Sequence, residues 1–350
     1  MTLTFSPEDI SPPDLCKRTD RLCRFCRLPG LGLGRITADG VAQLAVSGVR
    51  ARWQDAPVSP DDGWHIGSIT KSMTALLLAR FVTRGLIRLD APLGDLAALP
   101  LHPELARQSL RALLAHRAGL AANPPRAGFF VADLKAAAAN ERALRNEILA
   151  PALLEPPRPG RFRYSNIGYM MAGHIAEQIG DAAWPVLLQQ EIGTPLGLSS
   201  MGFGAPPSPG PMGHGSVLSM LVTLRGQGPT PGQPAEPTSP LADLSPAFGP
   251  AGLVHLTLAD LLRYGAAVEA LARGEDGIVP GSVFRDLITG QGYAGGWVIT
   301  ADGLRHDGSN GLWLADLRIR TRKRQVAAFV TNSGDLGALL AAWVWGLQKP

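Results

Sequence analysis

A serine and a lysine three residues apart, Ser68 and Lys71, stand at the start of an apolar segment that is typical of a helix. Residues with this spacing share one helix face, so the hydroxyl and the amine would be neighbours. A serine becomes a nucleophile when a base takes its proton, and a lysine among apolar residues has a lowered pKa that suits this task. Alone, the pattern is more typical of a serine near a helix N-cap followed by a surface lysine.

A second segment with chemical potential is Tyr164-Ser165-Asn166, which precedes another helical pattern. We expect Tyr164 to be a phenol whose pKa is lowered by a nearby cation, so that it can act as general acid and base. The amide of Asn166 would donate a hydrogen bond to a substrate carbonyl. Read alone, a tyrosine in this position is also typical of a buried structural hydroxyl.

The third segment runs from His306 to Asn310 and lies at an expected strand start. Gly308 would let a substrate approach the strand backbone. The N–H of Ser309 would join the N–H of Ser68 in an oxyanion hole. His306 would supply a hydrogen bond or a partial charge near neutral pH.

The elements that must position these groups follow from hydrophobic periodicity. Two apolar runs around Asp39-Gly40 predict a β-hairpin. The remaining pattern predicts helices near residues 68–84, 109–116, 131–150, 167–179, 184–192, 258–272 and 336–347, and strands near 296–300, 311–319 and 325–331. This order predicts an α+β fold, an α/β sandwich in which an antiparallel sheet built from both chain ends is flanked by helices.

The same pattern predicts the organisation of domains. We expect a sheet domain made of residues 29–90 and 246–350, into which a mostly helical domain of residues 91–245 is inserted. Residues 205–245 are rich in proline and glycine and predict a long loop within the inserted domain. Residues 1–28 are expected to form an irregular N-terminal extension.

Composition narrows the function. The 350 residues are 45% hydrophobic and 18% charged, which is typical of a globular protein. The net charge of +4 is spread along the chain and does not indicate a nucleic-acid partner. No apolar run is long enough to span a membrane, and no signal peptide is evident, so we expect a cytoplasmic protein. Cys16, Cys23 and Cys26 lack a fourth zinc ligand at a convincing spacing and are expected to be free thiols.

Taken together and in this order, the three segments resemble the serine β-lactamase-like superfamily. That family includes class C β-lactamases, DD-peptidases, D-aminopeptidases and β-lactamase-fold esterases. Residues 113–120 are similar to its Leu-Leu-x-His-x-Ser-Gly-Leu motif, with Ala118 in place of the usual serine. Residues 195–197 and 295–297 also match, so the resemblance runs from about residue 29 to residue 335.

The resemblance implies a β-lactamase/transpeptidase-like fold with a site between the sheet and the helical domain. It implies that Ser68 is the acylated nucleophile and that Lys71 and Tyr164 handle the proton, with the base left open. Asn166 would position the acyl part of the substrate. The chemistry needs no metal and no organic cofactor. We assign no catalytic role to two further histidines. His116 is expected to be structural, and His214 is expected to lie on the rim of the cleft.

One departure from the family affects the substrate. His306 stands where β-lactamases and DD-peptidases carry a lysine, and a histidine is mostly neutral at pH 7. Recognition of a substrate carboxylate should therefore be weaker. We expect hydrolysis of a small ester or amide, with a β-lactamase or D-amino-acid peptidase as the alternative and an inactive scaffold as the alternative from another class. The oligomeric state stays open.

Overall fold

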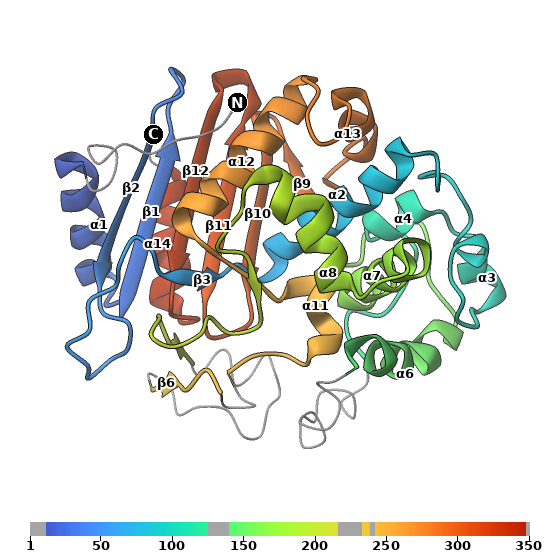
Figure 1. Ribbon diagram of the computed structural model, residues 1–350, viewed down its shortest axis with the longest axis horizontal. Helices are drawn as coiled ribbons and strands as arrows, with labels where there is room; N and C mark the ends of the chain where they lie inside the picture. Colours follow the sequence, from blue (N-terminus) through green and yellow to red (C-terminus); the bar gives the residue numbers. More distant parts are fainter. Residues whose placement is uncertain (1–11, 125–139, 216–232, 239–241, 348–350) are drawn as a thin grey trace.

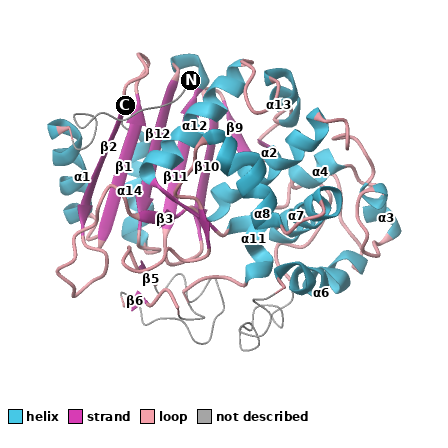
Figure 2. Cartoon of the chain, in the orientation of Figure 1, coloured by secondary structure: helices cyan, strands magenta, loops and turns pink. Residues whose placement is uncertain are grey.

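The fold is built on one antiparallel sheet of seven strands (Figures 1 and 2). In the computed structural model, residues 12–124, 140–215, 233–238 and 242–347 are described. The strand order is β2-β1-β12-β11-β10-β9-β8. The bounds are β1 Gly30–Ile36, β2 Ala42–Gly48, β8 Tyr293–Ala294, β9 Trp297–Thr300, β10 Gly303–Ser309, β11 Leu314–Arg320 and β12 Gln325–Thr331. The sheet therefore joins both chain ends, which confirms the predicted fold class.

Helices cover both faces of this sheet, because alternate residues of each strand point to opposite sides. On one face α12 (Leu258–Arg273) packs on Leu317 and Val326. On the other, α1 (Pro13–Phe25) lies beside β2, and α14 (Leu336–Leu347) lies against β11 and β12 (Figure 1). Two apolar layers thus enclose the sheet.

Helix α1 differs from the irregular N-terminal extension that we predicted. Leu15, Thr19, Leu22 and Cys23 are buried and share one helix face, whereas the rest of the helix is charged and largely exposed. Because charged residues outnumber these buried residues, the apolar periodicity of the segment is too weak to predict a helix from the sequence. The prediction was wrong for residues 13–25. The domain boundaries drawn from the sequence stay a prediction.

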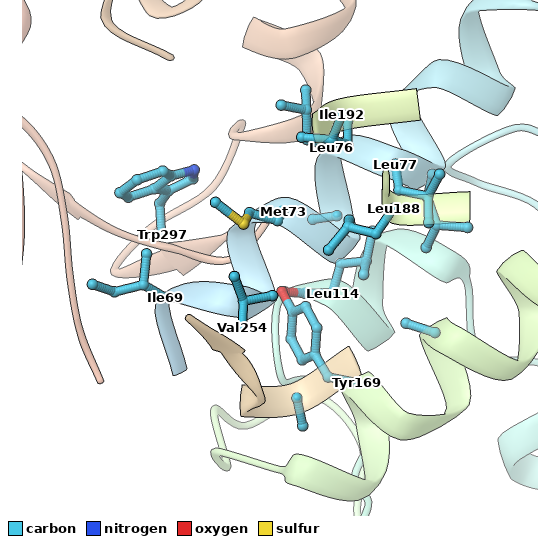
Figure 3. Packing of buried hydrophobic residues seen from close by; sticks show 14 of the residues in the cluster. Ile69, Met73, Leu76, Leu77, Leu114, Tyr169, Leu188, Ile192, Val254 and Trp297 are labelled. Atoms are coloured by element: carbon cyan, nitrogen blue, oxygen red, sulfur yellow. The ribbon is translucent and has the colours of Figure 1, made fainter. Parts of the chain in front are cut away.

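Helix α2 (Thr70–Thr83) is the centre of the helical region and is buried on almost every side. Met73, Leu76 and Leu77 point into the surrounding apolar core (Figure 3). The helices of this region, besides α2, are α3 Pro103–Ala106, α4 Leu110–Leu114, α6 Glu141–Leu154, α7 Asn166–Gly180, α8 Trp184–Leu188, α9 Thr194–Leu196, α11 Gly249–Gly252 and α13 Gly281–Leu287. A helix that is buried on nearly every side belongs in a core, so Ser68, just before its start, is held by a tightly packed element.

Short strands complete the fold. β3 (Gly63–His65), β7 (Val254–Thr257) and β4 (Gly202–Phe203) form a three-stranded sheet beside the start of α2. β5 (Gly213–His214) pairs with β6 (Pro234–Ala235) inside the predicted proline-rich loop, of which residues 216–232 and 239–241 lie outside the described residues. Within the described ranges, no helix is both long and apolar enough to cross a membrane.

A buried ion pair joins α6 to α7. Arg145 Nη1 lies 2.5 Å from Glu177 Oε1, and both side chains are fully buried. The Arg145 Nε also donates to the carbonyl oxygen of Ala247, and Glu177 Oε1 accepts from the N–H of Trp184. The pair therefore fixes four segments of the helical region at once.

Replacing Arg145 by methionine is expected to lower the free energy of unfolding by about 3–5 kcal/mol, because it leaves a buried carboxylate without its partner. Urea unfolding of the purified variant measures this loss. Arg142→Met, on the same helix but outside the pair, is the control and should change stability by about 0.5 kcal/mol or less. Equal effects of the two substitutions would contradict the assignment.

Candidate active site

Ser68 and Lys71 lie side by side where the chain enters α2. Ser68 is half-buried in a 3-10 turn, Gly67–Ile69, and Lys71 is on the first turn of α2 with no exposed surface. The Lys71 Nζ is 2.9 Å from the Ser68 Oγ. Burial lowers the pKa of Lys71 well below its ordinary value of 10.5, in the direction predicted from the apolar sequence.

Lys71 also contacts two carbonyl oxygens. Its Nζ lies 2.8 Å from Oδ1 of Asn166 and 2.5 Å from the main-chain oxygen of Ala251. Neither oxygen carries a full charge. Apart from the hydroxyl of Ser68, the amine is therefore surrounded by acceptors that do not offset the desolvation of an ammonium group.

Tyr164 faces the same amine with its ring. The Lys71 Nζ lies 4.8 Å from the centre of the Tyr164 ring, and the phenol oxygen makes a hydrogen bond with Ser68. Burial nevertheless raises the pKa of Tyr164 above its ordinary value, and the hydrogen bond to Ser68 opposes this rise only in part. The prediction of a lowered pKa was wrong, because Lys71 is itself desolvated and presents its amine to the ring face.

The end of β10 lies directly against the turn that carries Ser68. A Cβ atom on Gly308 would stand 2.1 Å from the Ile66 oxygen and 2.5 Å from the Ser68 nitrogen. A Cβ atom on Gly67, where φ is +50°, would stand 2.4 Å from the Ser309 nitrogen. The main-chain nitrogens of Ser68 and Ser309 therefore lie on the two sides of one close backbone contact.

This contact corrects two predictions. Gly308 makes room for the backbone of residues 66–68, rather than for a substrate. The His306–Ser309 segment also ends β10 instead of starting it.

His306 is placed differently from our expectation. Its side chain is buried, and its Nδ1 lies 2.6 Å from the carbonyl oxygen of Asp307, to which only an N–H can donate. Its Nε2 then accepts from the Tyr293 hydroxyl at 3.0 Å. Burial, with a smaller effect of the Lys71 charge, lowers the pKa of His306 to about 4. Both ring nitrogens are thus used inside the protein, and the ring is neutral at pH 7.

His116 and His214 both hold the chain together. The Nδ1 of His116 accepts from the N–H of Ser165, next to Tyr164. His214 is buried rather than on a rim: its Nε2 accepts from the N–H of Arg52, and its Nδ1 lies 2.7 Å from the Asn332 oxygen. The structural role expected of His116 agrees with this geometry.

Asn123 is a neighbour of the site that the sequence reasoning missed. The side chain of Asn166 donates through Nδ2 to Asn123 Oδ1 at 2.7 Å, which uses one of the two N–H groups of this amide. The N–H of Asn166 also donates to the oxygen of Ala122 and docks the loop. Since Asn123 is exposed, a chain of polar groups leads from Lys71 to the surface. An asparagine before a proline, just after the His116 motif, was the available signal.

The buried histidines predict how stability depends on pH. Burial lowers the pKa to about 2 for His116 and to about 4 for His174, His214 and His306, from an ordinary value of 6.5. The unfolded chain therefore binds protons below pH 6.5 that the folded protein excludes. Stability should be fully present above pH 6.5 and fall as the pH drops toward 4, by up to about 1.4 kcal/mol per pH unit for each histidine. Urea midpoints at pH 7.5, 6 and 5 test this, and a constant midpoint would contradict it.

The sheet is antiparallel and built from both chain ends, and the Ser-x-x-Lys turn lies between strand β10 and the helical region. This arrangement is the β-lactamase type of fold. Comparison with known proteins agrees: the sequence profile of the Beta-lactamase family matches residues 24–344, so the chain belongs to the Beta-lactamase family, whose fold is shared by hydrolases. The resemblance inferred from the motifs is confirmed.

Individual relatives match between 46% and 95% of the chain. Penicillin-binding protein 4 of Amycolatopsis lactamdurans is 28% identical over 91% of this chain and 84% of its own length. Esterase/beta-lactamase LipL of Mycobacterium tuberculosis is 26% identical over 46% of this chain and 35% of its own length. The D-amino acid amidase of Ochrobactrum anthropi SV3 matches with a TM-score of 0.74 at 19% identity, over 95% of this chain and 99% of the amidase, which shows a shared fold.

Proposed function

We propose that this protein is a serine hydrolase that cleaves a small ester or amide through an acyl-enzyme on Ser68. The observation that carries the proposal is the 2.9 Å contact between the Ser68 hydroxyl and the buried amine of Lys71. Ser68 is half-buried, so a substrate can reach it, whereas Lys71 is shielded from water.

Lys71 is the general base in this proposal. A neutral amine has two N–H groups and one lone pair. Two neighbours of Lys71, Asn166 Oδ1 and the Ala251 oxygen, can only accept, whereas the Ser68 hydroxyl can donate. The neutral amine therefore satisfies all three contacts with its lone pair on the serine proton, which is the arrangement that a base requires.

In the acylation step, the Ser68 Oγ bonds to the substrate carbonyl carbon, and its proton moves to the Lys71 Nζ. The oxyanion that forms accepts from the N–H groups of Ser68 and Ser309, and the close backbone contact between their segments supports this placement. The new ammonium group lies over the Tyr164 ring, which favours a cation. Tyr164, protonated at neutral pH, donates to the leaving group as its bond to carbon breaks and recovers a proton from Lys71. Water then releases the acyl group by the reverse sequence.

The neutral state of His306 supports an uncharged ester or amide as the substrate. A carboxylate would meet no full positive charge from this residue, and its ring nitrogens are already hydrogen-bonded. The second candidate is a β-lactamase or D-amino-acid peptidase, which the names of the penicillin-binding protein and the D-amino acid amidase favour. An inactive scaffold of the same fold is the non-enzymatic alternative.

A fluorophosphonate probe tests the proposal. The intact protein should be labelled on the peptide that contains Ser68, and Ser68→Ala should abolish the label. Turnover of p-nitrophenyl esters, D-alanyl amides and nitrocefin then separates the substrate classes, with the esters expected to react fastest. Label on another peptide, or no turnover of any substrate by a folded protein, would overturn the proposal.

A further inference from the structure

A histidine and an aspartate lie behind the Ser68 turn, outside the groups used so far. His65, the last residue of β3, is fully buried and stacks on Trp313 with ring centres 5.6 Å apart. Its Nδ1 accepts from the N–H of Gly67 at 3.1 Å, and its Nε2 is 2.9 Å from Asp243 Oδ2. The imidazole therefore bridges a carboxylate and the residue that precedes the nucleophile.

The same carboxylate also contacts the segment next to Ser309, the second residue of the proposed oxyanion hole. Asp243 Oδ1 accepts from the Asn310 side chain at 2.9 Å and from the N–H of Leu244 at 2.7 Å. Asn310 follows Ser309 and uses its own Oδ1 to accept from two main-chain N–H groups of the 310–313 turn. One carboxylate thus reaches Ser68 through His65 and Ser309 through Asn310.

The hydrogen bonds decide which ring nitrogen carries the proton. An Nδ1 that accepts from Gly67 must be unprotonated, so the proton lies on Nε2. The short distance to Asp243 supports the same assignment, although the Nε2–H does not point straight at the carboxylate oxygen. An unprotonated Nε2 would place its lone pair against those of the oxygen at 2.9 Å, which is unfavourable, so Nε2 carries the proton. The carboxylate therefore keeps Nδ1 available for the Gly67 N–H.

From these contacts we propose that Asp243 and His65 are positioning residues for the oxyanion hole. They fix the Gly67–Ser68 turn relative to Ser309, and so the spacing of the two N–H groups that receive the oxyanion. The inference rests on the proposed function, since it assigns these residues to the acylation step at Ser68. It adds two residues that never touch the substrate.

Asp243→Asn is the sharpest test because it keeps the shape and reverses one hydrogen bond. The N–H of Leu244 and the side chain of Asn310 both donate to Oδ1, so the new amide oxygen takes that place and the amide nitrogen faces His65. His65 must then accept at Nε2 and carry its proton on Nδ1, where it opposes the Gly67 N–H. The variant thus forces the wrong tautomer without removing a side chain.

Two measurements follow the effect. With p-nitrophenyl acetate, kcat of Asp243→Asn should fall about 10- to 100-fold, less than the loss of an oxyanion donor, with KM changed by less than about threefold. The rate of fluorophosphonate labelling should fall by a similar factor. Asp260→Asn is the matched control, because Asp260 is a buried carboxylate that binds Ser200 and Arg263 away from Ser68. It should leave kcat within about twofold.

The tautomer itself is read by long-range ¹H–¹⁵N spectra of the seven histidines, with His65 assigned by the signal lost in His65→Gln. Nε2–H is expected in the native protein and Nδ1–H in Asp243→Asn. A native Nδ1–H or cationic ring, or a kcat within twofold of native for Asp243→Asn, would overturn the inference. If the variant does not fold, the native spectrum still decides. Absent labelling of native Ser68 would refute the proposed function and leave the tautomer result standing.

Discussion

Lys71→Met is expected to lower kcat for an activated ester by about 10³–10⁴-fold, the upper range for loss of a general base. Methionine has a similar length and is apolar, so it fits the buried position that Lys71 occupies. The Ser68 hydroxyl would then have no base at 2.9 Å to take its proton. A thermal unfolding transition close to that of the native protein is the control for folding, and a variant that keeps a tenth of the native kcat would refute the role.

The pH profile makes this prediction specific to Lys71. The active form carries a neutral amine, and because burial lowers its pKa, activity should rise with pH through a value below 10.5. This rise of activity with pH should be absent in Lys71→Met. Tyr164→Phe is the comparison: it removes the phenol, whose pKa is raised, and should lower kcat by about 10² while the rise of activity with pH remains. If the rise of activity with pH were lost only in Tyr164→Phe, Tyr164 would be the general base instead of Lys71.

Regular elements with strong periodicity were predictable from the sequence. The Asp39-Gly40 hairpin and the C-terminal helix appear where the pattern placed them, as β1–β2 and α14. Their signals are local: a turn dipeptide between apolar runs and a long apolar segment. Helix α1 was not predicted because its charged residues outnumber its buried ones. Its apolar face is buried only through contact with β2, which the local sequence does not reveal.

The sequence was enough to predict which side chains form the site, but not their hydrogen-bond partners or protonation states. The motifs named Ser68 and Lys71, and their spacing along the chain is enough to bring the two groups together. The burial of His306 and its hydrogen bond to Tyr293 come from the fold of the sheet, and no sequence pattern contains them. Asp243 likewise reaches His65 from the end of the proline-rich loop. Long-range partners, not residue types, were the missing information.

Gly308→Ala should lower kcat by about 10²–10³-fold, as expected for the loss of an oxyanion donor. The added Cβ would meet main-chain atoms at 2.1 and 2.5 Å, and neither the Ile66 oxygen nor the Ser68 nitrogen can rotate away as a side chain would. The end of β10 must therefore move from the Ser68 turn, and Ser309 moves with it. A change of backbone spacing by even part of an ångström weakens both hydrogen bonds to the oxyanion.

Gly63→Ala is the matched control for this substitution. Gly63 lies in β3, close to the same turn, but a Cβ there would be 3.4 Å from the nearest atom, in the His255 ring. Its kcat should stay within about twofold of native, since the alanine side chain fits without displacing backbone. If Gly308→Ala and Gly63→Ala hydrolyse p-nitrophenyl acetate equally well, the contact between β10 and the Ser68 turn does not set the rate. The proposed oxyanion hole would then have to be placed elsewhere around Ser68.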